Sequence, residues 1–415
     1  MKLKCKAADF RVSELLDERY LSEHGPHQLY LVRKRKLTTD EAARVLAREA
    51  EVPHRSVRMA GLKDKQAVTL QYMSIEGGRQ IRYEDDFLSI EPIGRAAEPY
   101  SSQHSFGNAF EITVRDLSSR EVATARAAIP PLRKLGLPNY FDDQRFGNLR
   151  HDQGWVGLEL MRGRFEHALG TLICAPSPHD DARLADKKHA FERAWGDWSA
   201  CLRIARRSGE HQGVFEALVE SPQDFAAALQ RVPLRIRLIH LYAWQSHLWN
   251  RAVSGWIARR RECEPLALDS VDGPLWCWGR AWPEGADAQT SFRLPGQGLE
   301  DVQAPLQRQL FEDALAEHRL VGSQFRIDGL KGFQPKGEDR TLVLLPRKLR
   351  AKPPSPDNLH PARYCLRLTF ELPRAAYATL VVKRLFASEA PHPAEGRRPS
   401  AQRQKWKART NRRSE

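Results

Sequence analysis

The chain is 415 residues long and carries 66 Lys and Arg against 52 Asp and Glu, a formal net charge of +14. That length is enough for one large core and predicts two domains. No apolar run is long enough to span a bilayer, and the start, Met1-Lys2-Leu3-Lys4, lacks the apolar core of a signal peptide. These features argue against a membrane protein and a secreted protein, and we expect a cytoplasmic one.

Composition also indicates which partners and cofactors to expect. Residues 391–415 hold eight basic and two acidic residues, which leaves +8 on residues 1–390. A basic body attracts a polyanion such as RNA, although a merely basic surface is the alternative. The six cysteines form no Cys-x-x-Cys pair, and no phosphate-binding or dinucleotide-binding glycine loop occurs. We therefore expect no metal and no cofactor.

The first 110 residues predict strands mixed with one clear helix. Residues 28–32 have the composition of a strand. Thr38 and Glu41 make a capping box, and apolar residues follow at helical spacing as far as Ala50. Residues 67–75 are rich in β-branched and aromatic side chains and predict a further strand.

The middle of the chain, residues 164–340, differs in character and contains a strongly predicted helix at 238–256. One face of this helix carries Leu238, Leu241, Gln245, Leu248, Ala252 and Trp256. Arg235 and Arg251 supply positive charge around it, which is consistent with a phosphate-facing surface. Solvated helix charges are the commoner explanation of such a pattern.

The last predicted elements are a strand and a helix. Residues 363–371 alternate between apolar and polar side chains, as a half-buried strand does. A helix is expected to start at Pro373, with Lys383 and Arg384 turned away from its apolar face. Both ends of the chain thus predict parts of an α+β layer, separated by the long middle region.

The turn before residues 67–75 carries the chemistry that the sequence suggests. It reads Ala60-Gly61-Leu62-Lys63-Asp64-Lys65-Gln66, with a carboxylate between two lysines. A nearby cation favours the ionised carboxylate, as a nucleophile or general base requires. An Asp in a turn more often caps its own backbone, so the local sequence leaves both interpretations open.

Six segments, in the expected order, resemble the TruD family of pseudouridine synthases. The most specific is Leu-Pro-Asn-Tyr-Phe-Asp-Asp-Gln-Arg-Phe-Gly at 137–147, and the segment 61–71 is similar to the family's signature. The other four lie at 9–14, 107–112, 245–250 and 372–379. Two departures occur: Asp142 stands where the family usually has Gly, and Ala375-Ala376 replaces Gly-Ser.

The resemblance implies an activity and a set of site residues. The activity is the cofactor-independent conversion of a tRNA uridine into pseudouridine, with Asp64 as nucleophile and the target base flipped out of its stack. Tyr377 would stack on the flipped base, Asn139 would hydrogen-bond the nucleotide, Phe10 would pack against it, and Lys63 would give electrostatic support. Without the resemblance, Phe10 and Tyr377 could be core aromatics and Asn139 a turn residue.

The resemblance also implies an α+β fold with a mixed-sheet pseudouridine synthase core built from both chain ends. We expect this core in residues 1–163 and 341–390, a large inserted α/β domain in 164–340, and a disordered basic tail in 391–415. The expected partner is tRNA, and a monomer is expected. The competing hypothesis is a non-catalytic RNA-binding or RNA-folding factor on the same scaffold, against which the retention of Asp64, Asn139 and Tyr377 argues.

Overall fold

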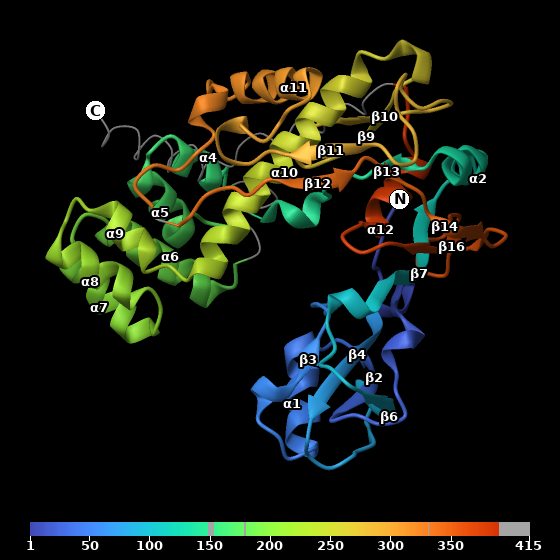
Figure 1. The fold of residues 1–415 in the computed structure, drawn as a ribbon, viewed down its shortest axis with the longest axis horizontal. Helices are drawn as coiled ribbons and strands as arrows, with labels where there is room; N and C mark the ends of the chain where they lie inside the picture. Colours follow the sequence, from blue (N-terminus) through green and yellow to red (C-terminus); the bar gives the residue numbers. More distant parts are fainter. Residues whose placement is uncertain (148–152, 178–179, 331, 390–415) are drawn as a thin grey trace. The chain divides into compact units, whose positions relative to one another are not determined.

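The computed structural model describes residues 1–147, 153–177, 180–330 and 332–389 (Figure 1). The described residues form two compact units, Met1–Leu137 with Leu344–Phe386, and Pro138–Val343 with the residues from Ala387 to Glu389. The sequence placed the boundaries after residues 163 and 340. The first boundary falls earlier because the 137–147 segment packs in the second unit, where the Phe141 amide donates to Asn250 Oδ1 at 2.9 Å. The predicted basic tail, 391–415, lies outside the described residues.

The first unit is built on a ten-stranded sheet with the order β14-β16-β7-β1-β4-β2-β6-β5, with β15 beside β16 and β3 beside β4. Its strands are β1 (Phe10–Leu16), β2 (His27–Arg35), β3 (Arg58–Met59), β4 (Val68–Glu76), β5 (Tyr83–Glu84), β6 (Leu88–Ala96), β7 (Ser105–Leu117), β14 (Arg347–Ala351), β15 (Ser355–Pro356) and β16 (Tyr364–Leu372). Because β1 and β4 pair parallel while β7 and β16 pair antiparallel, the sheet is mixed.

The two chain ends meet inside this sheet. Strand β7 pairs with β1 on one side and with β16 on the other, so that Phe110 lies between Val12 and Phe370. Gly107 of β7 has φ +143°, and a Cβ there would lie 2.0 Å from the carbonyl oxygen of Leu372, so this close crossing of β7 and β16 requires glycine. The predicted α+β core formed by both ends is confirmed.

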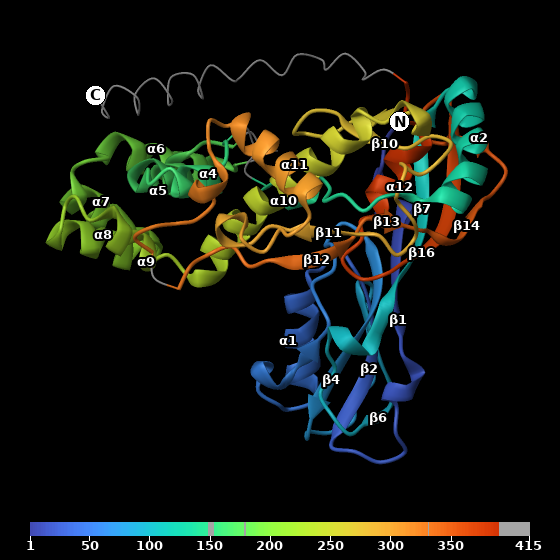
Figure 2. The same cartoon turned by 45° about the horizontal axis from the view of Figure 1, so that its top comes forward.

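Three helices pack on this sheet: α1 (Thr39–Glu49), α2 (Ser119–Leu135) and α12 (Ala378–Leu385). The capping box of α1 is present, since Thr38 Oγ1 accepts from the Glu41 amide at 3.1 Å. Figures 1 and 2 show α1 alongside β2 and β4, where its apolar face joins a cluster that includes Tyr30 and Met73.

The start of the last helix was predicted wrongly. Helix α12 begins at Ala378 and not at Pro373, because Ala375 adopts φ +60° and turns the chain first. The prediction that Arg384 turns away from the apolar face was also wrong. Arg384 is 3% exposed, because α12 buries most of its surface, including Leu380, Val381 and Val382.

The second unit is mainly helical. Its helices are α4 (Val156–Met161), α5 (Phe165–Cys174), α6 (Ala182–Ala194), α7 (Trp198–Ser208), α8 (Gln212–Glu220), α9 (Phe225–Gln230), α10 (Leu234–Ala258) and α11 (Pro305–Ala316), and its strands are β9 (Leu266–Leu268), β10 (Leu275–Cys277), β11 (Ser291–Leu294) and β12 (Glu338–Thr341). The chain enters and leaves this unit through the short strands β8 (Leu137–Pro138) and β13 (Val343–Leu344). Helix α10 contains the predicted 238–256 helix and buries Trp244 and Trp249 completely.

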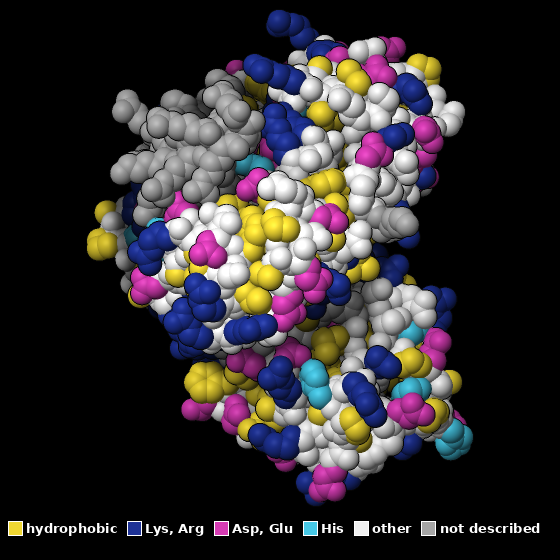
Figure 3. Space-filling view, turned by 90° about the vertical axis from the view of Figure 1, so that its left-hand side faces the viewer, with side chains coloured by type: hydrophobic (Ala, Val, Ile, Leu, Met, Phe, Trp, Pro, Cys, Tyr) yellow, Lys and Arg dark blue, Asp and Glu magenta, His cyan; other side chains and the backbone are white. Residues whose placement is uncertain are grey.

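Two features of the described residues concern binding partners: the distribution of surface charge, which matters for a polyanion, and the length and apolarity of the helices, which matter for a membrane. On the face drawn in Figure 3, Lys and Arg side chains are dispersed among Asp and Glu and do not form one continuous basic patch. Within the part of the chain that the structure describes, no helix has the length and apolarity to cross a membrane.

Candidate active site

Asp64 lies in the loop between β3 and β4, and its side chain is 37% exposed. Its Oδ1 accepts a hydrogen bond from the Gln66 amide at 2.9 Å, so the carboxylate caps its own turn. Its Oδ2 accepts a hydrogen bond from the Lys4 ammonium. The local sequence left two interpretations of Asp64 open, a cap of its own turn and a carboxylate beside a cation. The structure shows both.

Lys4 connects Asp64 to Phe10, because its Nζ also lies 4.6 Å from the centroid of the Phe10 ring. Burial acts to raise the pKa of Asp64. The hydrogen bonds from Lys4 and the Gln66 amide, together with the charges of Lys4 and Lys34, outweigh burial and leave this pKa below its ordinary value. The carboxylate is therefore ionised at neutral pH and available as a nucleophile or base.

The buried side chain of Lys34 holds the backbone of the loop that contains Asp64. This side chain is 0% exposed, and its ammonium donates to the carbonyl oxygens of Leu37 at 3.0 Å, Lys63 at 3.3 Å and Asp64 at 3.0 Å. Burial lowers the pKa of Lys34 to about 8, although the negative charges of Asp64 and Glu41 act in the opposite direction. A single buried cation thus fixes the backbone of the proposed nucleophile.

Lys63 forms its ion pair with Glu14 and not with Asp64, the acid that the sequence suggested. Its Nζ lies 3.2 Å from Glu14 Oε1, and Glu14 Oε2 accepts from the Tyr72 amide at 3.0 Å. Lys65 likewise pairs with Glu41, at 3.8 Å. Lys63 therefore supports the loop by anchoring it to β1, while the cation that contacts Asp64 is Lys4.

The substrate-binding candidates of the first unit occupy different environments. Phe10 is 5% exposed and packs edge-on against Phe110, with ring centroids 6.3 Å apart, so most of its surface belongs to the core. Tyr377 is partly exposed and is the residue immediately before α12. The structure thus brings Phe10, Lys63 and Asp64 around one loop and places Tyr377 at the start of a helix on the same sheet.

Ala375 offers a test of the local backbone. Because φ +60° is costly for alanine, we expect Ala375→Gly to raise the free energy of unfolding by about 0.5 to 1 kcal/mol. Ala376→Gly is the matched control, since Ala376 is not in the positive-φ region and should lose stability by a similar amount. Urea denaturation measures both changes, and a loss of stability in Ala375→Gly would contradict the strain.

Asn139 belongs to the second unit, where its side chain has protein partners. Its Nδ2 donates to the Thr341 carbonyl at 3.1 Å, and its Oδ1 accepts from Arg340 Nη2 at 3.1 Å. The Arg340 guanidinium also lies 3.9 Å from the centroid of the Phe141 ring. Asp142, at the position where the related pattern has Gly, has φ −89°, so this position needs no glycine.

The sequence did not single out Lys4, Glu14 or Lys34 as site residues. A signal for Lys34 was present, because strand alternation places it on the same face as Val32, which the core buries. Among the described residues, no group of three or more His, Cys, Asp or Glu side chains could hold a metal ion.

Comparison with known proteins gives three kinds of match. A family model described as tRNA pseudouridine synthase D (TruD) matches residues 1–272. "Probable tRNA pseudouridine synthase D 1" of Methanococcus maripaludis is 27% identical over 93% of this chain and 99% of its own. "Probable tRNA pseudouridine synthase D" of Methanopyrus kandleri is 30% identical, with 88% and 86% covered. The crystal structure of a putative TruD protein from Methanosarcina mazei matches with a TM-score of 0.67 and 23% identity, covering 93% of each chain.

Proposed function

Because the chain belongs to the TruD family of tRNA pseudouridine synthases, we propose that it isomerises a uridine of tRNA with Asp64 as the nucleophile. In this reaction Asp64 forms a transient bond to the nucleotide, the bond between ribose C1′ and uracil N1 breaks, and the uracil turns. A bond from C1′ to C5 then forms, C5 loses its proton, N1 gains one, and the bond to Asp64 breaks to free the carboxylate. The observation that carries the proposal is the ionised, partly exposed Asp64 held between Lys4 and Lys34.

The loop geometry supports a nucleophile of fixed position. Its backbone bonds to Lys34, its neighbour Lys63 is tied to Glu14, and its carboxylate bonds to Lys4, so each end of the Asp64 residue is restrained. A restrained reacting group reaches the geometry of attack at a smaller entropic cost. The target uridine would leave its stack to reach this loop, with Tyr377 as the proposed stacking platform.

Tritium release tests the proposed reaction. We would incubate the full chain with tRNA that carries tritium at uracil C5 and follow the label into water, since the C5 proton is lost on isomerisation. Release is expected with C5-labelled tRNA and not with tRNA labelled at ribose C1′. A chain that binds tRNA but releases no tritium from a mixture of all tRNAs would instead favour the non-catalytic RNA-binding hypothesis.

Lys4 provides a second test, through pH dependence. In Lys4→Met the largest influence that lowers the pKa of Asp64 is lost while burial remains, so this pKa should rise. The acid limb of the kcat profile should therefore move to higher pH, and activity should fall first in acid. Lys2→Met is the matched control, because Lys2 pairs with Asp116 and not with Asp64. If the acid limb did not shift, Lys4 would not be the residue that lowers the pKa of Asp64.

A further inference from the structure

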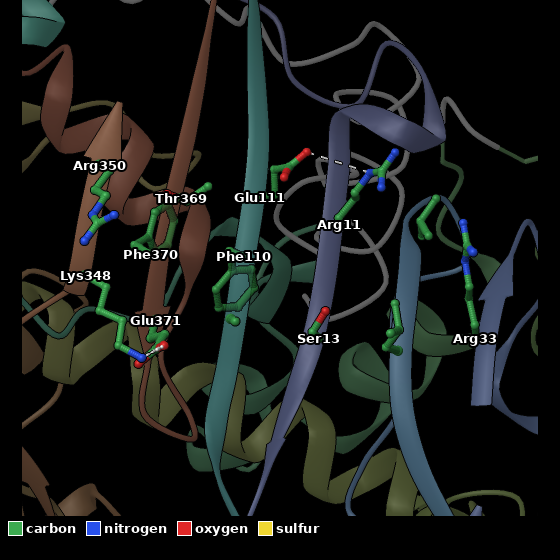
Figure 4. Close-up of a pocket in the computed structure, with 13 residues that line it drawn as sticks. Arg11, Ser13, Arg33, Phe110, Glu111, Lys348, Arg350, Thr369, Phe370 and Glu371 are labelled. Carbon is green, nitrogen blue, oxygen red and sulfur yellow. Dashed lines mark hydrogen bonds and ion pairs between the residues drawn. The ribbon is translucent and has the colours of Figure 1, made fainter. Parts of the chain in front are cut away.

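A groove of about 600 Å³ lies on one face of the sheet in the first unit (Figure 4). Six strands contribute to it, from β14 and β16 across β7 and β1 to β4 and β2. Its lining includes four cations, Arg11, Arg33, Lys348 and Arg350, and two acids, Glu111 and Glu371. The groove is therefore positively charged.

This groove opens on the face opposite to the side chains that hold the Asp64 loop. Successive side chains of a strand point to opposite faces, so Ser13 and Arg33, which line the groove, oppose Glu14 and Lys34. Helix α1 covers the face of Lys34, as its shared core with Val32 shows. The groove is thus a second surface, separate from the candidate active site.

The acids of the groove are already paired, but two of its arginines are not. Glu111 lies 3.9 Å from Arg11, and Glu371 lies 2.6 Å from Lys348, as the dashed lines of Figure 4 mark. Arg33 and Arg350 are exposed, and their guanidinium groups have neither a hydrogen bond nor an ion pair with any residue in the described part of the chain. Two positive charges are therefore left for an anionic partner.

The separation of these two arginines selects the kind of anion. Arg33 lies on β2 and Arg350 on β14, five strand spacings apart, which corresponds to roughly 24 Å across the sheet. A free phosphate or a nucleotide can contact only one of them. An extended polyanion can contact both, and it releases condensed counterions at each contact.

We propose that this groove is a second RNA-binding surface, in which Arg33 and Arg350 contact backbone phosphates of the tRNA away from the uridine at Asp64. The inference rests on the proposed function for its choice of tRNA as the polyanion. Phosphate contacts of this kind carry no sequence information and instead set the register and affinity of the RNA.

The salt dependence of tRNA binding tests the groove. We would measure the Kd of the full chain for tRNA between 50 and 200 mM KCl for the wild type, Arg33→Gln, Arg350→Gln and the double variant. Each single change should weaken binding at low salt and reduce the slope of log Kd against log salt by about 1, and the double change by about 2. At saturating tRNA, kcat for tritium release should not change, because neither residue holds the Asp64 loop.

Arg44→Gln is the matched control, since Arg44 is an exposed arginine of α1 that pairs with Asp40 at 2.8 Å. It removes the same charge from the other face of the sheet and should leave the slope unchanged. Equal slopes for Arg33→Gln, Arg350→Gln and Arg44→Gln would overturn the proposal. So would a light-scattering mass showing that wild type is a dimer and the double variant a monomer, because the groove would then hold a second copy. If the wild type released no tritium while Arg33→Gln and Arg350→Gln still weakened tRNA binding, the proposed function would be overturned. The proposed RNA-binding surface would remain.

Discussion

Asp64→Asn is expected to lower kcat for tritium release by at least about 10³-fold while changing the Kd for tRNA by less than about twofold. Asparagine keeps an Oδ1 that can accept from the Gln66 amide, so the turn that Asp64 caps should persist. It lacks the negative charge and the nucleophilic oxygen. The substitution therefore separates the chemical role of Asp64 from its structural one, and single-turnover kinetics with C5-tritiated tRNA measures the difference.

Asp85 supplies the control for a purely structural Asp. Its Oδ1 accepts from the amides of Phe87 at 2.7 Å and Leu88 at 2.8 Å, so it also caps its own turn. Asp85→Asn should leave kcat and Kd near their wild-type values. If Asp64→Asn retained activity as Asp85→Asn does, Asp64 would be a capping residue only, and the proposed mechanism would be lost.

Lys34→Met is expected to have the second-largest effect, a fall in kcat of about 10- to 100-fold with a much smaller change in the KM for tRNA. Methionine is close in volume to the lysine side chain but removes the ammonium donor of the Asp64 carbonyl and leaves the Lys63 carbonyl with the Thr39 hydroxyl at 3.4 Å. The loop would then shift, and a displacement of about 1 Å at a reacting group can cost about 10²-fold in rate. Steady-state kinetics with tritiated tRNA separates kcat from KM.

Lys65→Met is the matched control, because Lys65 is adjacent to Asp64 but its Nζ lies 3.8 Å from Glu41 at the surface. It should change kcat by less than about twofold, since an exposed pair of this kind contributes little. An equal fall in kcat for both variants would show that positive charge near the loop matters and not the buried anchor.

The buried ammonium of Lys34 also predicts a pH dependence of stability. Its pKa is about 8 in the folded chain and near its ordinary 10.5 in the unfolded chain, so between these values the unfolded state binds more protons. The free energy of unfolding of the wild type, relative to Lys34→Met, should therefore rise as the pH increases from 7.5 to 9.5, by about 2 kcal/mol. Urea denaturation at the two pH values measures it, and a flat or falling difference would contradict the buried charge.

Much of the fold was predictable because its signals are local. The capping box of Thr38 and Glu41 starts α1, and the alternation at 363–371 corresponds to β16, since both depend on neighbours a few residues apart. The start of α12 was not predictable in the same way. Ala375 adopts a positive φ there and Arg384 is buried, each against the preference of its residue type, and such departures depend on the tertiary structure.

The sequence by itself determined the family, the α+β core with a mixed sheet made by both chain ends, and Asp64 as the candidate nucleophile. These follow from the order of motifs and the periodicity of strands, which can be read along the chain. Only the tertiary structure decided which cation contacts that carboxylate. Lys4, 60 residues away, bonds to Asp64, while the adjacent Lys63 turns to Glu14. The physical reason is that distance in the folded chain decides which side chains pair. Because β1 and β4 pair in parallel, Glu14 of β1 and Lys4, which precedes β1, lie near the loop that precedes β4, although they are far from it in the sequence.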